Sequence, residues 1–204
     1  MTSKIFAVFG AGGHARVVSS IIRALGGEVY GFFDDSFAEA EIIQEAPLRG
    51  TFADISLCLP TTKYAALALG DNAKRQNAFH QLQQWGFSLP ALLHPRAHIE
   101  VDAQVGEGTV VCLGAMLGTE SVVGRGSIVN TGAVIDHESS LGDFSHIAPG
   151  AVIAGRTRIG HRVFVGMNAC IADGLRVGDN SIIGAGSVVL ADVPEGAKIL
   201  GIHH

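Results

Sequence analysis

Residues 105–123 read VGEGTVVCLGAMLGTESVV, and every sixth residue in this stretch is a large aliphatic one. The same register continues in both directions without an insertion. It comprises Leu93, Ile99, Val105, Val111, Leu117, Val123, Val129, Ile135, Leu141, Ile147, Ile153, Ile159, Val165, Ile171, Val177, Ile183 and Val189. The residue four places after each aliphatic is Ser, Thr, Ala or Val, with Leu175 as the exception.

A period of six is neither helical nor that of a simple alternating strand, and it is the sequence signature of a parallel β-helix. One short strand per hexad and three hexads per coil predict a three-sided prism filled by the aliphatic side chains. The small residue is expected at the corner, where space is limited. A glycine follows the aliphatic in about half of the hexads, as at Gly106, Gly118 and Gly142. We interpret these glycines as relief of the backbone at positive φ.

Composition narrows the class of protein. The 204 residues suffice for one large domain or two small ones, and 48% are hydrophobic while 16% are charged. The net charge of −5 argues against nucleic acid as a partner. No apolar run reaches the roughly 18–20 residues of a membrane span, and the N-terminal residues do not form a signal peptide. The cysteines, Cys58, Cys112 and Cys170, are scattered. We therefore expect a cytoplasmic protein with no membrane partner and no thiol-based metal site.

A glycine-rich turn follows the first apolar run of the chain. The run at residues 5–9 predicts a buried parallel strand, and Gly10-Ala11-Gly12-Gly13-His14-Ala15 leads into a helical pattern. A second predicted strand, residues 29–33, ends in Asp34-Asp35. This order is half of a nucleotide-binding α/β unit, in which glycines and a helix N-terminus approach a phosphate and acids contact ribose or base. The alternative is a plain tight turn, because Ala15 replaces the last glycine of the motif. One half-unit favours a mononucleotide or a nucleotide sugar over a dinucleotide.

Capping residues, glycine and proline predict where the remaining elements begin and end. Residues 64–69 predict another strand, and Asp71 is a candidate N-cap for a helix over residues 73–85. Gly70 then lies at the carboxyl end of a strand, the usual ligand side of an open α/β sheet. We predict a nucleotide-sugar-binding Rossmann-like domain at 1–88 and a β-helix domain at 89–204. Pro194 is predicted to end the β-helix, because proline cannot donate to a strand ladder.

One coil carries side chains that could perform chemistry. His137 lies two places after the inward Ile135, so we expect it near a corner and pointing outward. A carboxylate beside it can orient the imidazole and raise its basicity, as general base catalysis requires. Glu138 can do so only if the backbone turns at this point, and Asp136 is the rival partner. The alternative is an inert surface histidine.

These features together resemble the PglD/NeuD-type bacterial sugar acetyltransferases, over nearly the whole sequence. The stretches that carry the resemblance are Gly10-Ala11-Gly12-Gly13-His14, Phe33-Asp34-Asp35, Gly70-Asp71-Asn72, residues 130–138 from Asn130 to Glu138, and residues 144–150 from Phe144 to Gly150. The resemblance implies an α/β N-terminal Rossmann-like half-domain followed by an all-β left-handed parallel β-helix. The general rule for parallel crossovers would have given the opposite hand.

The family pattern also implies roles for individual residues. His137 is implied to be the catalytic base and Glu138 the acid that raises its basicity. The residues implied to bind the nucleotide sugar are Gly12, Gly13, His14, Asp34, Asp35 and Gly70. Those implied to contact acetyl-CoA are Asn130, His146, Gly155, Met167 and Ala185. At its end the sequence departs from the family's G-x-P-A-K-like tail, because Gly201 is followed by Ile202-His203-His204.

The activity implied is acetyl-CoA-dependent N-acetylation of a nucleotide-linked amino sugar, a UDP- or GDP-linked 4-amino-4,6-dideoxy sugar, by direct attack with His137 as the base. Acetyl-CoA is the cosubstrate and no metal is required. Homotrimers with acetyl-CoA in the groove between two prisms are implied as well.

Three other functions remain open. The same fold could O-acetylate a sialic acid or a related sugar. A zinc-dependent lyase similar to the γ-type carbonic anhydrases would need three histidines around the metal. His137, His146 and His161 lack the close pair expected for such a site. The third alternative is a scaffold that binds other proteins without catalysis.

Overall fold

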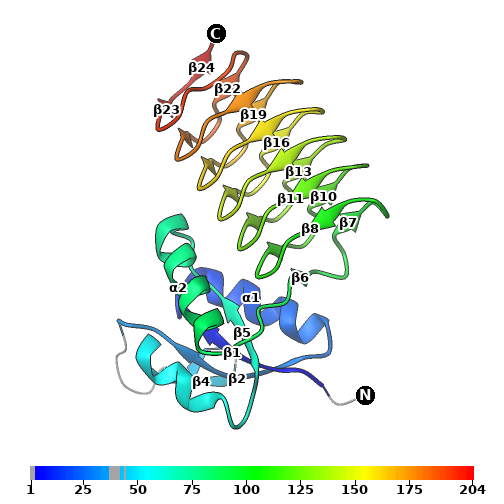
Figure 1. Ribbon diagram of the computed structural model, residues 1–204. Helices are drawn as coiled ribbons and strands as arrows, with labels where there is room; N and C mark the ends of the chain where they lie inside the picture. The colour runs from blue at the N-terminus through cyan, green and yellow to red at the C-terminus, as the bar shows by residue number, and fades with distance from the viewer. Residues whose placement is uncertain (1–2, 37–41, 44) are drawn as a thin grey trace. The chain divides into compact units, whose positions relative to one another are not determined.

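The computed structural model describes residues 3–36, 42–43 and 45–204, which form two compact units, Met1–Pro95 and Arg96–His204 (Figure 1). The predicted boundary, at 88/89, lies a few residues earlier. Leu92–Leu93 form the short strand β6, which contacts helix α1 of the first unit.

The first unit is an open α/β sheet with strand order β3-β4-β2-β1-β5. The strands are β1 (Ile5–Phe9), β2 (Glu28–Phe33), β3 (Ile42–Ile43), β4 (Ala46–Gly50) and β5 (Tyr64–Leu67). All neighbours are parallel except β3 and β4. The helices are α1 (Gly13–Ala24), α2 (Asn72–Gln84) and the 3-10 helix η1 (Phe52–Cys58). No helix in the described part of the chain is long and apolar enough to cross a membrane.

Local sequence accounts for these elements. The apolar run of β1 is buried from Phe6 to Phe9, as a central parallel strand requires. Helix α1 turns Val18, Ile21 and Ile22 inward, at the spacing that puts them on one face. Asp71 caps α2 as predicted, because its side chain accepts a hydrogen bond of 2.8 Å from the backbone amide of Lys74.

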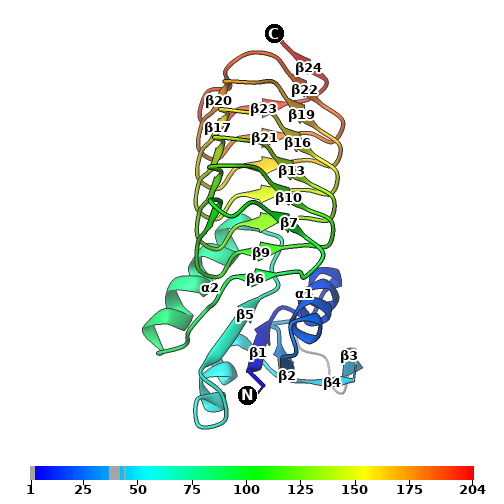
Figure 2. The same cartoon turned by 90° about the vertical axis from the view of Figure 1, so that its right-hand side faces the viewer.

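The second unit is a left-handed parallel β-helix of two-residue strands (Figure 2). Its strands are β7 (His98–Ile99), β8 (Gln104–Val105), β9 (Val110–Val111), β10 (Met116–Leu117), β11 (Val122–Val123), β12 (Ile128–Val129), β13 (Val134–Ile135), β14 (Ser140–Leu141), β15 (His146–Ile147), β16 (Val152–Ile153), β17 (Arg158–Ile159), β18 (Phe164–Val165), β19 (Cys170–Ile171), β20 (Arg176–Val177), β21 (Ile182–Ile183), β22 (Val188–Val189), β23 (Lys198–Ile199) and β24 (Ile202–His203). Three sheets form its faces, in the orders β7-β10-β13-β16-β19-β22-β24, β8-β11-β14-β17-β20 and β9-β12-β15-β18-β21-β23.

The register confirms three hexads per coil. Met116 pairs with His98 on one side and with Val134 on the other, so equivalent residues recur at every third hexad. The aliphatic residue of each hexad points into the prism, and Leu117, Ile147 and Ile183 are fully buried. Since each buried side chain of this kind contributes roughly 1.5–3 kcal/mol, the interior holds the stack together.

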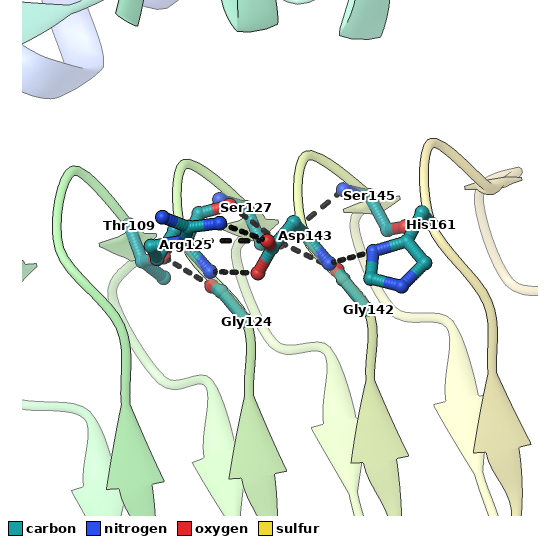
Figure 3. Close-up of polar contacts among 8 residues, drawn as sticks. All are labelled: Thr109, Gly124, Arg125, Ser127, Gly142, Asp143, Ser145 and His161. Carbon is teal, nitrogen blue, oxygen red and sulfur yellow. Dashed lines mark hydrogen bonds and ion pairs between the residues drawn. The ribbon is translucent and has the colours of Figure 1, made fainter. Parts of the chain in front are cut away.

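The small residues at the corners do more than save space. Thr109 Oγ1 donates to the carbonyl of Gly124 at 2.7 Å and accepts from the amide of Ser127 at 3.1 Å. Ser127 and Ser145 repeat this arrangement in the next coils, so one column of hydroxyls satisfies buried backbone groups (Figure 3). The sequence pattern indicated their size but not this hydrogen bonding.

A second column of polar groups lies beside the first (Figure 3). In successive coils a side chain accepts a hydrogen bond from the backbone amide of the equivalent residue in the coil before. Asp143 accepts from Arg125 at 2.8 Å, His161 Nδ1 from Asp143 at 3.0 Å, and Asp179 from His161 at 2.9 Å. His161 therefore serves as a backbone partner through Nδ1.

The interpretation of the glycines was wrong. Positive φ occurs instead at every sixth residue from Gly108 to Gly186, and these include non-glycine residues such as Glu138 and Phe144. The glycine that directly follows the aliphatic is required by the neighbouring coil. A Cβ added to Gly142 would lie 2.5 Å from the carbonyl carbon of Gly160. These glycines allow two backbones to approach closely.

The predicted end of the β-helix was also wrong. Strand β23 pairs with β21, and β24 pairs with β22, so the ladder continues beyond Pro194. Val193 donates to the carbonyl of Arg176 and accepts from the amide of Gly178, both at 2.8 Å. Because Val193 makes these bonds, the proline after it leaves the ladder intact. The last coil is shortened, because Ile182 pairs with Lys198, whereas three full hexads would place Leu200 opposite it.

Close approach of the coils predicts that Gly142→Ala destabilises the protein. The added Cβ would meet backbone atoms that cannot move aside, and we expect a loss of about 1–3 kcal/mol, the usual cost of overpacking. Thermal unfolding measures the change. Gly174→Asn is the matched control, because a Cβ at Gly174 meets no atom within 4 Å and the chain uses Asn168 and Asn180 at the equivalent positive-φ position. Equal stability of both variants would contradict the explanation.

Candidate active site

His137 and Glu138 form an ion pair or hydrogen bond at a corner of the β-helix. The distance from His137 Nδ1 to Glu138 Oε2 is 3.1 Å, and both side chains are about half exposed. Adjacent residues in a strand point to opposite sides, but Glu138 has φ of +57° and turns its side chain back toward the imidazole. Asp136 instead accepts a hydrogen bond of 2.7 Å from the backbone amide of His137. Glu138 is thus the carboxylate that holds the ring, and Asp136 holds the backbone.

The ring of His137 lies against Gly155, which occupies the same corner in the next coil. A Cβ added to Gly155 would lie 2.5 Å from both Cε1 and Nε2 of His137. Gly155 is buried under the ring and has no side chain to displace it. Two features therefore fix the imidazole: the carboxylate at Nδ1 and the bare backbone beneath Nε2.

A recess of about 250 Å³ opens beside His137. It is lined by His98, Glu100, Met116, Leu117, Gly118, Thr119, Val134, Ile135, Asp136 and His137. All of these residues belong to the first three coils on the β7, β10 and β13 side of the prism. The sequence analysis did not identify His98 or Glu100. They flank the inward Ile99, so they look like ordinary outward residues of a hexad.

Two of the residues expected to contact acetyl-CoA lie together. Asn130 Nδ2 is 3.2 Å from His146 Nε2. His146 is 9% exposed, and its ring meets that of Phe164 edge to face, with the ring centroids 5.2 Å apart. Phe164 was not singled out in the sequence, although it pairs with His146 from the next coil of the same face.

Met167 and Ala185 share another corner of the prism. The amide of Gly186 donates to the carbonyl of Met167 at 2.8 Å, and Ala185 is the equivalent of Met167 in the next coil. The side chain of Met167 is exposed, as is Ala185. Both lie away from the His137 corner along the coil, so the residues expected to contact acetyl-CoA extend over two corners and a face.

In the first unit, the glycine turn is tied to the acidic pair. The amide of Ala11 donates to Asp34 Oδ2 at 2.8 Å, and Ser36 donates to Asp34 Oδ1 from its amide at 2.9 Å and from its hydroxyl at 2.5 Å. Partial burial opposes ionisation, but these hydrogen bonds outweigh it and hold the pKa of Asp34 below its usual range. Gly12 and Gly13 stand at the start of α1, with no atom within 4 Å of a Cβ added to either.

A cavity of about 570 Å³ lies at the carboxyl ends of β1 and β2. Its lining comprises Phe9, Asp34, Asp35, Ser36, Phe52, Leu69, Lys74, Asn77, Ala78 and Gln81. Asp35 also accepts a hydrogen bond of 2.9 Å from the amide of Phe52. The sequence analysis did not identify the α2 residues of this lining, Lys74, Asn77, Ala78 and Gln81. Their spacing places them on one face of the helix.

Two basic side chains lie near these loops. Arg75 is 1% exposed, and its Nη1 donates to the carbonyls of Leu69 at 3.0 Å and Gly70 at 3.1 Å. Burial, assisted by the positive charge of Arg75, lowers the pKa of His14 to about 4, so this imidazole is neutral at neutral pH. Gly70 is thus held by the helix that follows it.

The described residues include no group of three or more His, Cys, Asp or Glu side chains arranged to hold a metal ion.

Comparison with protein-family models identifies two matches. Residues 5–82 match the PglD N-terminal domain, and residues 156–191 match the bacterial transferase hexapeptide model, which comprises six repeats. A comparison with curated protein sequences finds no significant match. The fold and the family models define an acyltransferase of the hexapeptide-repeat class.

Comparison with solved structures identifies the family within this class. The chain is 32% identical to a histidine-to-alanine mutant of GDP-perosamine N-acetyl transferase from Caulobacter crescentus in complex with CoA and GDP-perosamine, over 96% of this chain and 93% of that one, with a TM-score of 0.93. It is 35% identical to the acetyltransferase domain of PglB from Neisseria gonorrhoeae FA1090 in complex with acetyl coenzyme A, over 98% and 97% of the chains, with a TM-score of 0.92. The chain belongs to the PglD-type sugar acetyltransferase family.

With His137 as the expected base, its contact with Gly155 predicts that Gly155→Ala impairs acetyl transfer. A methyl group at this position displaces the ring, and a shift of about 1 Å in a reacting group can cost roughly 10²-fold in rate. The resemblance implies that Gly155 contacts acetyl-CoA, whereas its place under the His137 ring favours a role in seating the imidazole. We therefore expect kcat to fall by about 10- to 100-fold while KM for acetyl-CoA stays unchanged. Gly174→Asn, at the same corner one coil further, is the control. A rise in KM for acetyl-CoA with unchanged kcat would instead assign Gly155 to cofactor binding.

Proposed function

We propose that this protein transfers the acetyl group of acetyl-CoA to the amine of a nucleotide-linked amino sugar, with His137 as the general base. The observation that carries the proposal is the His137–Glu138 pair, 3.1 Å apart and seated on Gly155, beside a recess in a member of a sugar acetyltransferase family. The relatives in complex with CoA and GDP-perosamine support a nucleotide-linked amino sugar as the acceptor. A UDP- or GDP-linked 4-amino-4,6-dideoxy sugar is the acceptor that the family resemblance implies.

The chemistry proceeds by direct attack. The amine nitrogen forms a bond to the acetyl carbonyl carbon, the carbon–sulfur bond breaks, and CoA leaves as a thiolate. His137 takes the proton from the nitrogen and passes it to sulfur, which yields free CoA thiol and the amide. Since the carboxylate of Glu138 accepts a hydrogen bond from Nδ1–H, Nε2 is the nitrogen that receives the proton. No covalent enzyme intermediate is needed.

The first unit supplies the nucleotide site in this proposal. Open space above Gly12 and Gly13 at the start of α1 suits a diphosphate, because the first amides of a helix have no intrahelical acceptor. The cavity lined by Asp35 and Gln81 offers hydrogen-bonding groups for ribose and base. Asp34 contributes by fixing the turn at Ala11, and Arg75 holds Gly70 through its carbonyl. His14 lies in the first turn of α1, where burial and the charge of Arg75 lower its pKa to about 4.

We also propose a homotrimer with acetyl-CoA bound between two β-helices, in contact with His146, Asn130, Met167 and Ala185. The sheet from β7 to β24 supports the oligomer, because it exposes an apolar column. Its exposed members include Met116, Val152, Val188 and Ile202. The face from β8 to β20 instead exposes Gln104, Arg158 and Arg176. An apolar column of this length is typical of a protein–protein contact.

The test of the activity is a screen of amino-sugar nucleotides and of free sialic acid with acetyl-CoA, following thiol release. We expect turnover with an amino-sugar nucleotide. His137→Ala should lower kcat by ~10²–10⁴-fold, the usual contribution of a positioned base, and Glu138→Gln by less, because the ring keeps its seat on Gly155.

Thermal unfolding of both variants serves as the control, since exposed side chains should affect stability little. Wild-type turnover in His137→Ala would remove the base from the mechanism. Turnover only with sialic acid would replace the proposed acceptor with a hydroxyl.

The apolar column predicts a second outcome. Val152→Glu should convert the trimer to monomers, because a carboxylate in an apolar contact must be desolvated without a partner. Sedimentation velocity measures the mass, and Gln104→Glu on the polar face is the control. A wild-type protein that sediments as a monomer would refute the proposed assembly.

A further inference from the structure

A guanidinium lies one coil beyond the carboxylate of Glu138. The amide of Arg156 donates to the carbonyl of His137 at 2.9 Å, and Arg156 has φ of +54° where Glu138 has φ of +57°. The two residues therefore occupy equivalent places at the same corner, and such places lie about 4.7–4.9 Å apart. A guanidinium this close to a carboxylate can form a charge-assisted pair with it. Arg156 is thus a competitor of His137 for Glu138.

The structure shows a different pairing. Arg156 Nη2 lies 2.5 Å from Asp173 Oδ2 in the coil that follows, and no ion pair joins Arg156 to Glu138 among the described residues. Glu138 turns back to the imidazole of the residue before it, whereas the residue before Arg156 is Gly155, which has no side chain. Asp173 holds the place of Gly155 one coil later and supplies the partner that Gly155 lacks.

Loss of Glu138 to Arg156 would change where the imidazole carries its proton. A neutral imidazole is protonated on one of its nitrogens, and the hydrogen bonds of the ring determine which one. Glu138 accepts from Nδ1–H of His137 and so leaves Nε2 without a proton. With Glu138 held by the guanidinium, Nδ1 has no carboxylate partner and the proton can occupy Nε2. A ring in that form cannot receive a proton from an amine at Nε2.

We propose that Asp173 is a positioning residue for the base, because it holds Arg156 away from Glu138 and keeps His137 in the Nδ1–H tautomer. Both side chains of the Arg156–Asp173 pair are about half exposed, so the pair contributes little to stability. Its effect is on the choice of partner at a corner where one guanidinium lies between two carboxylates. The proposal rests on the role of His137 in the activity proposed above, and it assigns a function to a residue two coils beyond it.

The decisive variant is Asp173→Asn, which keeps the shape of the side chain and releases Arg156. Nitrogen-15 NMR of the imidazole in alkaline buffer reports the tautomer of His137 directly. We expect the Nδ1–H form to predominate in the wild type and the Nε2–H form to increase in the variant. At saturating substrates kcat should fall by about 3- to 10-fold with KM for acetyl-CoA unchanged, a modest loss because exposed ion pairs are weak.

The double variant Asp173→Asn with Arg156→Gln tests the cause. It should recover the wild-type tautomer and kcat, because no guanidinium remains to compete for Glu138. Asp143→Asn is the matched control, since it removes the carboxylate of another exposed ion pair of the same unit, with Arg125, away from the His137 corner. It should change neither the tautomer nor kcat.

An unchanged tautomer in Asp173→Asn would overturn the role of Asp173. Failure of the double variant to recover the tautomer and kcat would overturn it as well, since the loss would then be structural. A wild-type protein that shows the expected tautomers but acetylates no amino-sugar nucleotide would refute the proposed activity and leave the role of Asp173 in orienting the ring standing.

Discussion

The hydrogen bonds between successive coils determine most of what the second unit can contain. Amide-to-carbonyl distances repeat at 2.9 Å, as from Val110 to Ser127, from Met116 to Ala133 and from Val122 to Ser139. Strands bonded in this way lie about 4.7–4.9 Å apart, which leaves no room for a side chain wherever two backbones face each other at a turn. Glycine after the aliphatic, hydroxyls at the corners and the seat of His137 on Gly155 all follow from this spacing.

The sequence predicted the architecture because its determinants are periodic. The aliphatic series specifies which residue of each hexad points inward, and three hexads per coil belong to the β-helix that this period indicates. The glycines could not be interpreted in the same way, because they occur at two hexad positions, as Gly106 and Gly108 do, and the sequence does not say which position has positive φ. Only the stacked coils distinguish a glycine that faces a neighbouring backbone, such as Gly106, from one with φ of +66°, such as Gly108. Pro194 was misread for a similar reason, since its effect depends on which amides the last coil uses.

The sequence also predicted some parts of the candidate site and missed others. His137 and Glu138 are neighbours in sequence. The sequence analysis stated that Glu138 could orient the imidazole only if the backbone turned between them, and the structure has this turn. Gly155 comes from the coil after His137 and Asp173 from the coil after that, so their relation to the ring follows only once the coil length is applied. In the first unit, the glycine turn and the acids were apparent, whereas Arg75 and the polar face of α2 were not. Their contribution arises from the packing of α2 against the loop before it.

A coil of three hexads restricts how such a protein can change in length during evolution. Insertion of one whole coil would leave each side chain on its original face, so the prism could grow without disturbing what its surfaces bind. Insertion of a single hexad would preserve the aliphatic interior but rotate all later residues to the next face, and His137 would lose Gly155 as its neighbour if the insertion fell between them. A stable fold and an intact site thus tolerate different mutations. The shortened last coil, in which Ile182 pairs with Lys198, lies beyond the His137 corner, where a change of register leaves the contact between His137 and Gly155 intact.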